Sequence, residues 1–162
     1  LPEYQIKIFC TPKEADVFKR HFAKEDVLPS GFGNVYGVLK EACLLVSLDT
    51  SVKHLAALTQ TPVLELSIGS SHPTKTAAYS EGNYILSALQ TCRPCDHSAK
   101  CPYLRNLCQD SISEKTVSDF VINWVHNLKL THFDMRTTIR DNNLGFEKGK
   151  LWITSKNNEI CI

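Results

Sequence analysis

The residues best suited to chemistry lie in the segment 47–54, which begins at the end of an apolar run at 44–48 and continues beyond it. The apolar run suits a buried strand and the residues from Val52 onward suit a helix, so the polar residues stand where a strand gives way to a helix. The first amides of a helix have no partner within it, and the helix dipole adds roughly half a positive charge there. Such a junction can cradle a diphosphate, although an ordinary helix cap with a surface histidine is the alternative. The candidate ligand-binding residues are Asp49, Thr50, Ser51 and His54.

Lys53 could add positive charge to this segment, but its spacing from His54 directs it to another side of the helix.

Four of the seven cysteines stand in one short stretch with the spacing Cys-x2-Cys-x5-Cys-x6-Cys. Four thiolates suit a structural zinc site, and a Cys-x2-Cys pair is the usual first half of one. The second half is looser, so two disulfides, an iron–sulfur cluster and free thiols stay open, and His97 could substitute as a ligand. In each case the expected role is to hold a loop in place. The candidate zinc ligands are Cys92, Cys95, Cys101 and Cys108.

Strand and helix patterns alternate from residue 5 to residue 128, which predicts an α/β fold with a Rossmann-like parallel sheet. The clearest helix has apolar residues at i, i+3, i+4, i+7 and i+8, preceded by a capping signal from Ser111 and Glu114. A C-terminal appendage, either a hairpin or a partly ordered segment, is expected over residues 131–162. The expected strands are 5–10, 44–48, 63–68 and 84–89. The expected helices are one that begins at Pro12 with Thr11 as its N-cap, and then 35–42, 52–60 and 113–128, and residues 28–33 are expected to be a turn-rich connection.

Composition excludes some classes of function. The formal net charge is +1 with both signs interspersed, which gives no basic face for nucleic acid. The apolar runs are far shorter than the roughly 20 residues that span a bilayer, so no transmembrane segment is expected.

The run from Leu45 to Pro62 resembles the motif Asp-Thr/Ser-Gly-x-x-His-x-Ala-Ala-x-x-x-x-Pro of the ADP-heptose:lipopolysaccharide heptosyltransferases, glycosyltransferase family 9. Residues 69–73, Gly-Ser-Ser-His-Pro, resemble the Gly-Pro-Thr-x-Pro loop of that family. Residues 76–79 stand where Thr-Gly-Pro-Tyr is usual, and residues 92–95 match a frequent Cys-x-Pro-Cys. These blocks agree in order and spacing over residues 3–128.

The resemblance implies a GT-B glycosyltransferase, in which two Rossmann-like halves face each other across a cleft. Residues 1–130 correspond to the C-terminal half, which binds the nucleotide sugar, with its first strand missing. The acceptor-binding half and the catalytic base would lie before Leu1, so no catalytic residue is expected here and the fragment alone is expected to be inactive. The implied reaction transfers heptose, or a related sugar, from ADP-heptose or another nucleotide sugar to the lipopolysaccharide core. The transfer itself needs no cofactor, and a structural zinc at the cysteine cluster is a separate hypothesis. The expected location is cytoplasmic, with a peripheral place at the inner membrane through the full-length enzyme as one alternative.

By position, the resemblance assigns the phosphate-contacting segment to Asp49, Thr50, Ser51 and His54, and the sugar or phosphate side of the cleft to Gly69, Ser70 and Ser71. Ser51 departs from the pattern, because the family usually has Gly there. Its Cβ narrows the approach of the backbone to a phosphate, unless its hydroxyl replaces an amide contact.

Two other hypotheses stay open. One is a non-catalytic binding module whose cysteine-rich zinc knuckle contacts a protein or a nucleic acid. The other is a domain that folds but binds nothing, because its first strand is missing.

Overall fold

A computed structural model shows the arrangement of the chain. It describes residues 4–29, 31–69, 73–78, 83–88 and 106–126, the isolated positions 90, 92, 94–95, 100–101 and 103, and the backbone of 137–141, 152–155 and 158–161.

The N-terminal part of the chain is a small βαβ unit. Strands β1 (Ile8–Cys10) and β2 (Val27–Pro29) run parallel, and α1 (Ala15–Phe18) and the 3-10 turn η1 (Lys24–Asp26) connect them. The expected turn-rich connection at 28–33 is therefore wrong at both ends, because Leu28 and Pro29 pair with β1 and helix α2 begins at Phe32. A proline is tolerated there because β2 is an edge strand of its sheet.

The turn before α1 is closed by two local hydrogen bonds. The amide and the hydroxyl of Thr11 both donate to the Oε2 atom of Glu14, over 2.9 and 2.7 Å. The hydroxyl bond, and then the amide bond, hold the pKa of Glu14 below its usual value.

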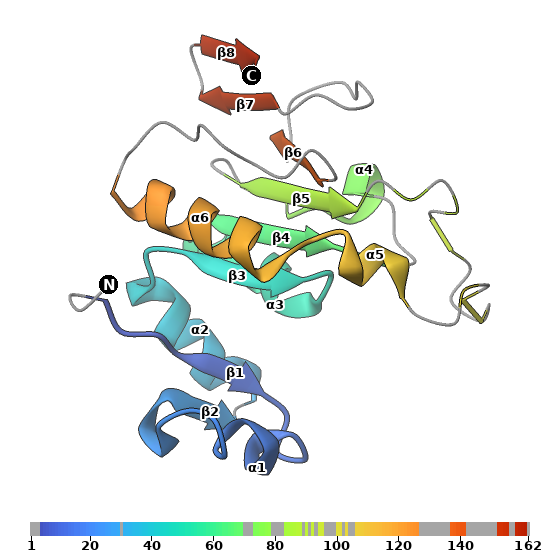
Figure 1. Cartoon of the computed structure of the whole chain (residues 1–162). Coiled ribbons are helices and arrows are strands. Elements are labelled where there is room, and N and C mark those ends of the chain that lie inside the picture. Colours follow the sequence, from blue (N-terminus) through green and yellow to red (C-terminus); the bar gives the residue numbers. More distant parts are fainter. Residues whose placement is uncertain are drawn as a thin grey trace.

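The main sheet has the order β3-β4-β5-β6 (Figure 1). Its strands β3, β4 and β5 are parallel, and β6 pairs with β5 in the antiparallel sense. Helices follow β3 and β4 and connect each strand to the next, so the predicted alternation and the Rossmann-like α/β class are confirmed. The elements are α2 (Phe32–Glu41), β3 (Leu45–Leu48), α3 (Ser51–Thr59), β4 (Val63–Ser67), α4 (Pro73–Thr76), β5 (Tyr84–Ala88) and β6 (Thr137–Asp141).

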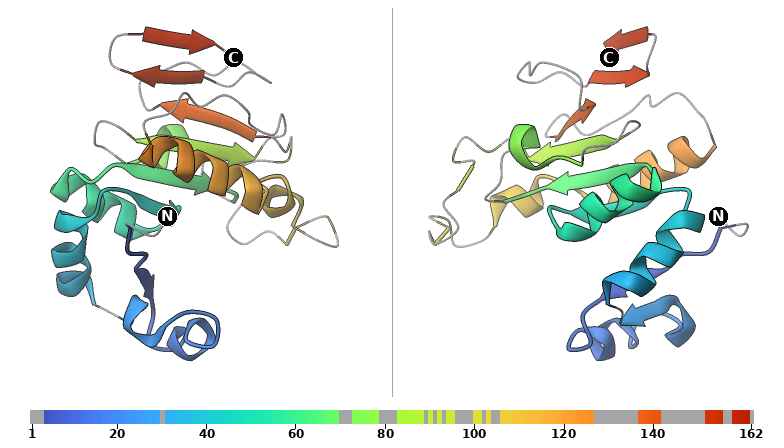
Figure 2. Two further views of the ribbon diagram at one scale, coloured as in Figure 1. Left: turned by 60° about the vertical axis from the view of Figure 1, so that its left-hand side comes forward. Right: turned by 180° about the vertical axis from the view of Figure 1, so that it is seen from behind.

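Helices cover both faces of this sheet (Figure 2). On one face α2 and α3 pack on β3 and β4 through an apolar cluster that includes Leu39, Leu45 and Ala56. On the other face lie α5 (Leu107–Asp110) and α6 (Glu114–Val125). The α6 residue Phe120 is fully buried and meets the Tyr84 ring edge-on, with ring centroids 5.1 Å apart.

The predicted cap of α6 is wrong by two residues. Ser113 is the N-cap, and its hydroxyl accepts a hydrogen bond from the amide of Thr116 over 3.1 Å. The hydroxyl of Ser111 instead donates to the carbonyl of Cys108 at the end of α5, over 2.8 Å. Ser111 and Ser113 both stand near the start of α6. Because the hydroxyl of Ser111 is bonded to the end of α5, Ser113 is the residue that caps α6.

The described residues of the C-terminal segment include the strands β6, β7 and β8. β6 extends the main sheet, whereas β7 (Trp152–Ser155) and β8 (Asn158–Cys161) form an antiparallel pair. The division of the chain at residue 130 stays a prediction. In the described part of the chain, no helix has the length and apolar character needed to cross a membrane.

Replacing Phe120 by alanine tests the core under α6. The loss of a fully buried ring that packs on Tyr84 should lower the free energy of unfolding by about 3–5 kcal/mol, measured by urea denaturation. Ile122→Ala is the matched control, because Ile122 lies on the same helix but is 42% exposed, and it should cost less than about 1 kcal/mol. Equal losses in the two variants would contradict this packing.

Candidate functional site

The junction between β3 and α3 is an exposed turn at the carboxyl end of the parallel sheet. Asp49, Thr50 and Ser51 are all exposed, and α3 begins at Ser51 with Thr50 as its N-cap residue. Thr50 has extended backbone angles, but its hydroxyl bonds to the hydroxyl of Ser47 over 3.0 Å and caps no helix amide. Like α1 and α2, and in contrast to α5 and α6, α3 therefore has no side-chain cap among the described residues.

A buried lysine lies directly beneath this turn. The Lys53 side chain is 0% exposed, and its ammonium group lies 2.5 Å from the Asp49 carboxylate and 2.9 Å from the Glu65 carboxylate. Glu65 stands in the middle of β4 and its side chain is 2% exposed. Charges are stable in such a place only when they are paired with good geometry, so Lys53 and Glu65 depend on each other.

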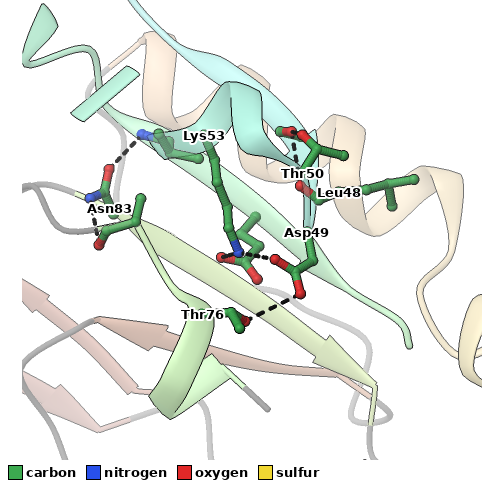
Figure 3. A network of polar contacts seen from close by, with 10 residues as sticks. Leu48, Asp49, Thr50, Lys53, Thr76 and Asn83 are labelled. Carbon is green, nitrogen blue, oxygen red and sulfur yellow. Dashed lines mark hydrogen bonds and ion pairs between the residues drawn. The ribbon is translucent and has the colours of Figure 1, made fainter. Parts of the chain in front are cut away.

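The same lysine fixes the Asp49 carboxylate. Figure 3 shows the Lys53 side chain reaching from α3 to Asp49, with Thr76 on the far side of that carboxylate. The Thr76 hydroxyl of α4 donates to the second carboxylate oxygen over 3.2 Å. Both Asp49 oxygens thus point to the protein, and the turn is joined to α3 and to α4.

Asn83 stabilises the opposite, amino-terminal end of β4. It is buried, its side-chain oxygen accepts from the amide of Val63 over 2.9 Å, and its side-chain nitrogen lies 3.5 Å from the carbonyl of Ala78 (Figure 3). The strand that carries Glu65 is therefore tied to the segment before β5.

The other predicted ligand-binding residues are partly described. His54 is half-buried in the first turns of α3. Gly69 is exposed just after β4, so it lies at the same edge of the parallel sheet as the Asp49 turn. A Cβ atom built on Gly69 would meet no heavy atom within 4 Å in the described structure. Ser70 and Ser71 lie outside the described residues.

The zinc prediction concerns the four clustered cysteines Cys92, Cys95, Cys101 and Cys108. In the described part of the chain, no group of three or more His, Cys, Asp or Glu side chains is arranged to hold an ion, and no disulfide joins the described cysteines. Cys108 is buried in α5, whereas Cys101 is exposed. Residues 96–99, which include His97, lie outside the described residues, and the zinc site stays a prediction.

Comparison with known protein families matches residues 2–104 to "Glycosyltransferase family 9 (heptosyltransferase)", which is well over half of the chain. The chain belongs to glycosyltransferase family 9. Comparison with curated proteins and with solved structures gives no significant match. Membership of family 9 identifies the chain as a glycosyltransferase domain of the heptosyltransferase type and implies a nucleotide-sugar donor and a sugar acceptor.

The sequence pattern of family 9 did not reveal the partnership of Lys53 and Glu65. The spacing predicted only that Lys53 lies on another side of the helix from His54, whereas in the structure its buried side chain reaches both Glu65 and the Asp49 carboxylate of the turn. One signal was present in the sequence, since Glu65 interrupts an apolar strand that is expected to be buried on both faces. A carboxylate in that position needs a cation, and Lys53 is the basic residue of the helix that packs on the strand.

Replacing Lys53 by methionine tests the buried ion pairs. The change removes the ammonium group that pairs with the buried Glu65 carboxylate, so the free energy of unfolding should fall by about 3–5 kcal/mol. Lys115→Met is the control, because the Lys115–Asp119 pair has the same 2.5 Å spacing but an 81% exposed lysine, and its loss should cost less than about 1 kcal/mol.

A double variant separates lost packing from unpaired charge. Lys53→Met combined with Glu65→Leu should recover most of the lost stability, because neither replacement is charged and Asp49 remains 27% exposed to water. Urea denaturation gives the free energy of unfolding of the unaltered chain, of Lys53→Met, of Glu65→Leu and of the double variant. Additive losses in the double variant would argue against a charge-pairing role for Lys53.

Proposed function

We propose that this family 9 domain binds the diphosphate of a nucleotide sugar at the Asp49–Ser51 turn and donates the sugar within a GT-B glycosyltransferase. ADP-heptose or a related nucleotide sugar is the proposed donor, and the lipopolysaccharide core is the proposed acceptor. The observation that supports the proposal best is the exposed start of α3, which has no side-chain cap in the described structure and stands at the carboxyl end of β3.

The chemistry of the turn suits a diphosphate. Amides at the start of α3 point out of the helix, and the dipole of this nine-residue helix favours an anion there. A carboxylate next to a phosphate would oppose binding, but both oxygens of Asp49 are engaged, by Lys53 and by Thr76. Asp49 therefore contributes the shape and the backbone of the turn, while its negative charge is balanced from within the protein.

The neighbouring residues supply the rest of the proposed site. The imidazole of His54 donates to a phosphate oxygen, and the segment at Gly69 lets the backbone approach the sugar or phosphate side of the ligand. These donors stabilise the charge that develops on the departing nucleoside diphosphate. Deprotonation of the acceptor hydroxyl needs a general base, which the proposal assigns to the acceptor-binding half of the enzyme.

The first test of the proposal is a thermal shift with ADP. A ligand that binds the folded protein at about 100 times its Kd adds roughly 2.7 kcal/mol of stability, so ADP should raise the Tm of the chain. His54→Ala should remove most of this rise, and His126→Ala, at the exposed end of α6, should leave it intact. If ADP and ADP-sugars leave the Tm of the unaltered chain unchanged, the donor site is wrong.

Ser51→Asp gives a second, sharper test, because its effects on stability and on binding have opposite signs. An aspartate in the first turn of α3 should stabilise the helix by about 0.3–1 kcal/mol through the helix dipole. The same charge should repel a diphosphate and abolish the shift with ADP. Ser118→Asp, at an exposed position within α6, is the control for added charge and should keep the shift.

Gly69→Ala tests whether the second segment approaches the ligand. The free energy of unfolding should change by less than about 0.5 kcal/mol, because the added methyl group meets no described atom within 4 Å. Affinity for an ADP-sugar, measured by calorimetry, should fall by about tenfold if the methyl group occupies the space of the ligand. Gly37→Ala, within α2, is the control and should leave affinity unchanged. Unchanged affinity in Gly69→Ala would remove this segment from the site.

A further inference from the structure

The two polar side chains just before α3 are turned away from the first amides of that helix. The Thr50 hydroxyl contacts the Ser47 hydroxyl over 3.0 Å. The Asp49 carboxylate contacts the Lys53 ammonium with one oxygen and the Thr76 hydroxyl with the other (Figure 3). In the described structure, no hydrogen bond joins either side chain to an amide of α3. Both side chains that could cap the helix are therefore held elsewhere.

Asp49 is the more important of the two, because it has the chemistry to compete with an anionic ligand. Aspartate is one of the side chains that most often accept hydrogen bonds from the first amides of a helix, and the helix dipole stabilises its charge there. A phosphate binds the same amides for the same reasons. Asp49 stands one residue before the N-cap of α3, and its side chain is 27% exposed. Its carboxylate, once released, is thus an internal competitor for the diphosphate.

The position of Lys53 prevents this release. Asp49 and Lys53 are four residues apart, so their ion pair draws the carboxylate along the side of α3 and away from its end. The ammonium is itself anchored, because it also pairs with Glu65 of β4 over 2.9 Å. An exposed lysine can exchange a carboxylate for water, whereas the Lys53 side chain is 0% exposed and keeps its carboxylates.

We propose that Lys53 is a positioning residue for diphosphate binding: its buried ammonium, anchored by Glu65, holds the Asp49 carboxylate away from the amides that bind the phosphates. This role rests on the proposed donor site and gives the ion pairs a function in addition to stability. Without Lys53 the carboxylate caps α3, and the ligand has to displace it. Lys53 acts through Asp49 and does not touch the ligand, because its side chain is fully buried.

A purely structural role for the ion pairs is the alternative. In that case Lys53 and Glu65 only support the packing of α3 on β4, so an uncharged pair that restores stability also restores binding. The double variant Lys53→Met with Glu65→Leu separates the two roles. It removes one positive and one negative charge, so the formal net charge stays at +1, and it leaves Asp49 in place. A loss of affinity in this variant cannot then come from the total charge.

The test measures the binding of ADP and of inorganic pyrophosphate to the full chain by calorimetry. Both ligands should bind the double variant about tenfold more weakly than the unaltered chain, because only molecules with an uncapped α3 can bind them. The loss should be the same for the two ligands, since the competition concerns the phosphate groups that they share. A cooperative urea transition shows that the double variant is folded.

Removal of the Asp49 charge should restore the affinity. Asp49→Asn, added to the double variant, keeps the size of the side chain and an acceptor for the Thr76 hydroxyl, but a neutral amide is the weaker competitor for the helix amides. Asp119→Asn, added to the same double variant, is the matched control. It removes one negative charge from α6 and should leave the affinity low.

Thr76→Val tests the same competition without a change in the core. It frees one oxygen of Asp49 while Lys53 still holds the other, so both affinities should fall by a smaller factor, about threefold. Asp49→Asn should restore them here as well. This variant decides the question if the double variant does not fold.

Three results would overturn the positioning role of Lys53. These are equal affinities in the unaltered chain and the variants, no recovery with Asp49→Asn, and an equal recovery with Asp119→Asn. In each of them the unaltered chain binds ADP, so the donor site itself stands. An unaltered chain that binds neither ADP nor pyrophosphate would overturn the donor site, and the role of Lys53 with it.

Discussion

The buried ammonium of Lys53 is the contact on which the site depends. A charge with 0% exposure must be paired, and here it is paired with one carboxylate from the start of its own helix and one from the centre of β4. This requirement fixes the position of α3 over the sheet, because sliding the helix would separate the ammonium from Glu65. It also fixes the exposed turn, because Asp49 is held at the carboxyl end of β3.

Side chains and backbone have different roles in this arrangement: the side chains balance one another's charges, and the backbone at the start of α3 faces solvent. Acidic and basic side chains satisfy one another inside the protein, and the start of α3 stays open to solvent without a side-chain cap in the described structure. An anion can then be bound by amides and a helix dipole, which need no cationic surface. This accounts for a phosphate-binding proposal in a family 9 chain whose formal net charge is only +1.

The sequence by itself determined the α/β class, the positions of the strands β1, β3, β4 and β5 and of the longer helices, the family and the place of the turn at 49–51. These features depend on apolar periodicity and on short motifs, whose physical causes act between near neighbours in the chain. Only the tertiary structure decided that Lys53 pairs with Glu65, that Ser113 caps α6 in place of Ser111, that β2 is a strand and that the parallel strands form two sheets. Each of these features depends on which distant segment of the chain packs against a residue, and the local sequence pattern does not identify that segment.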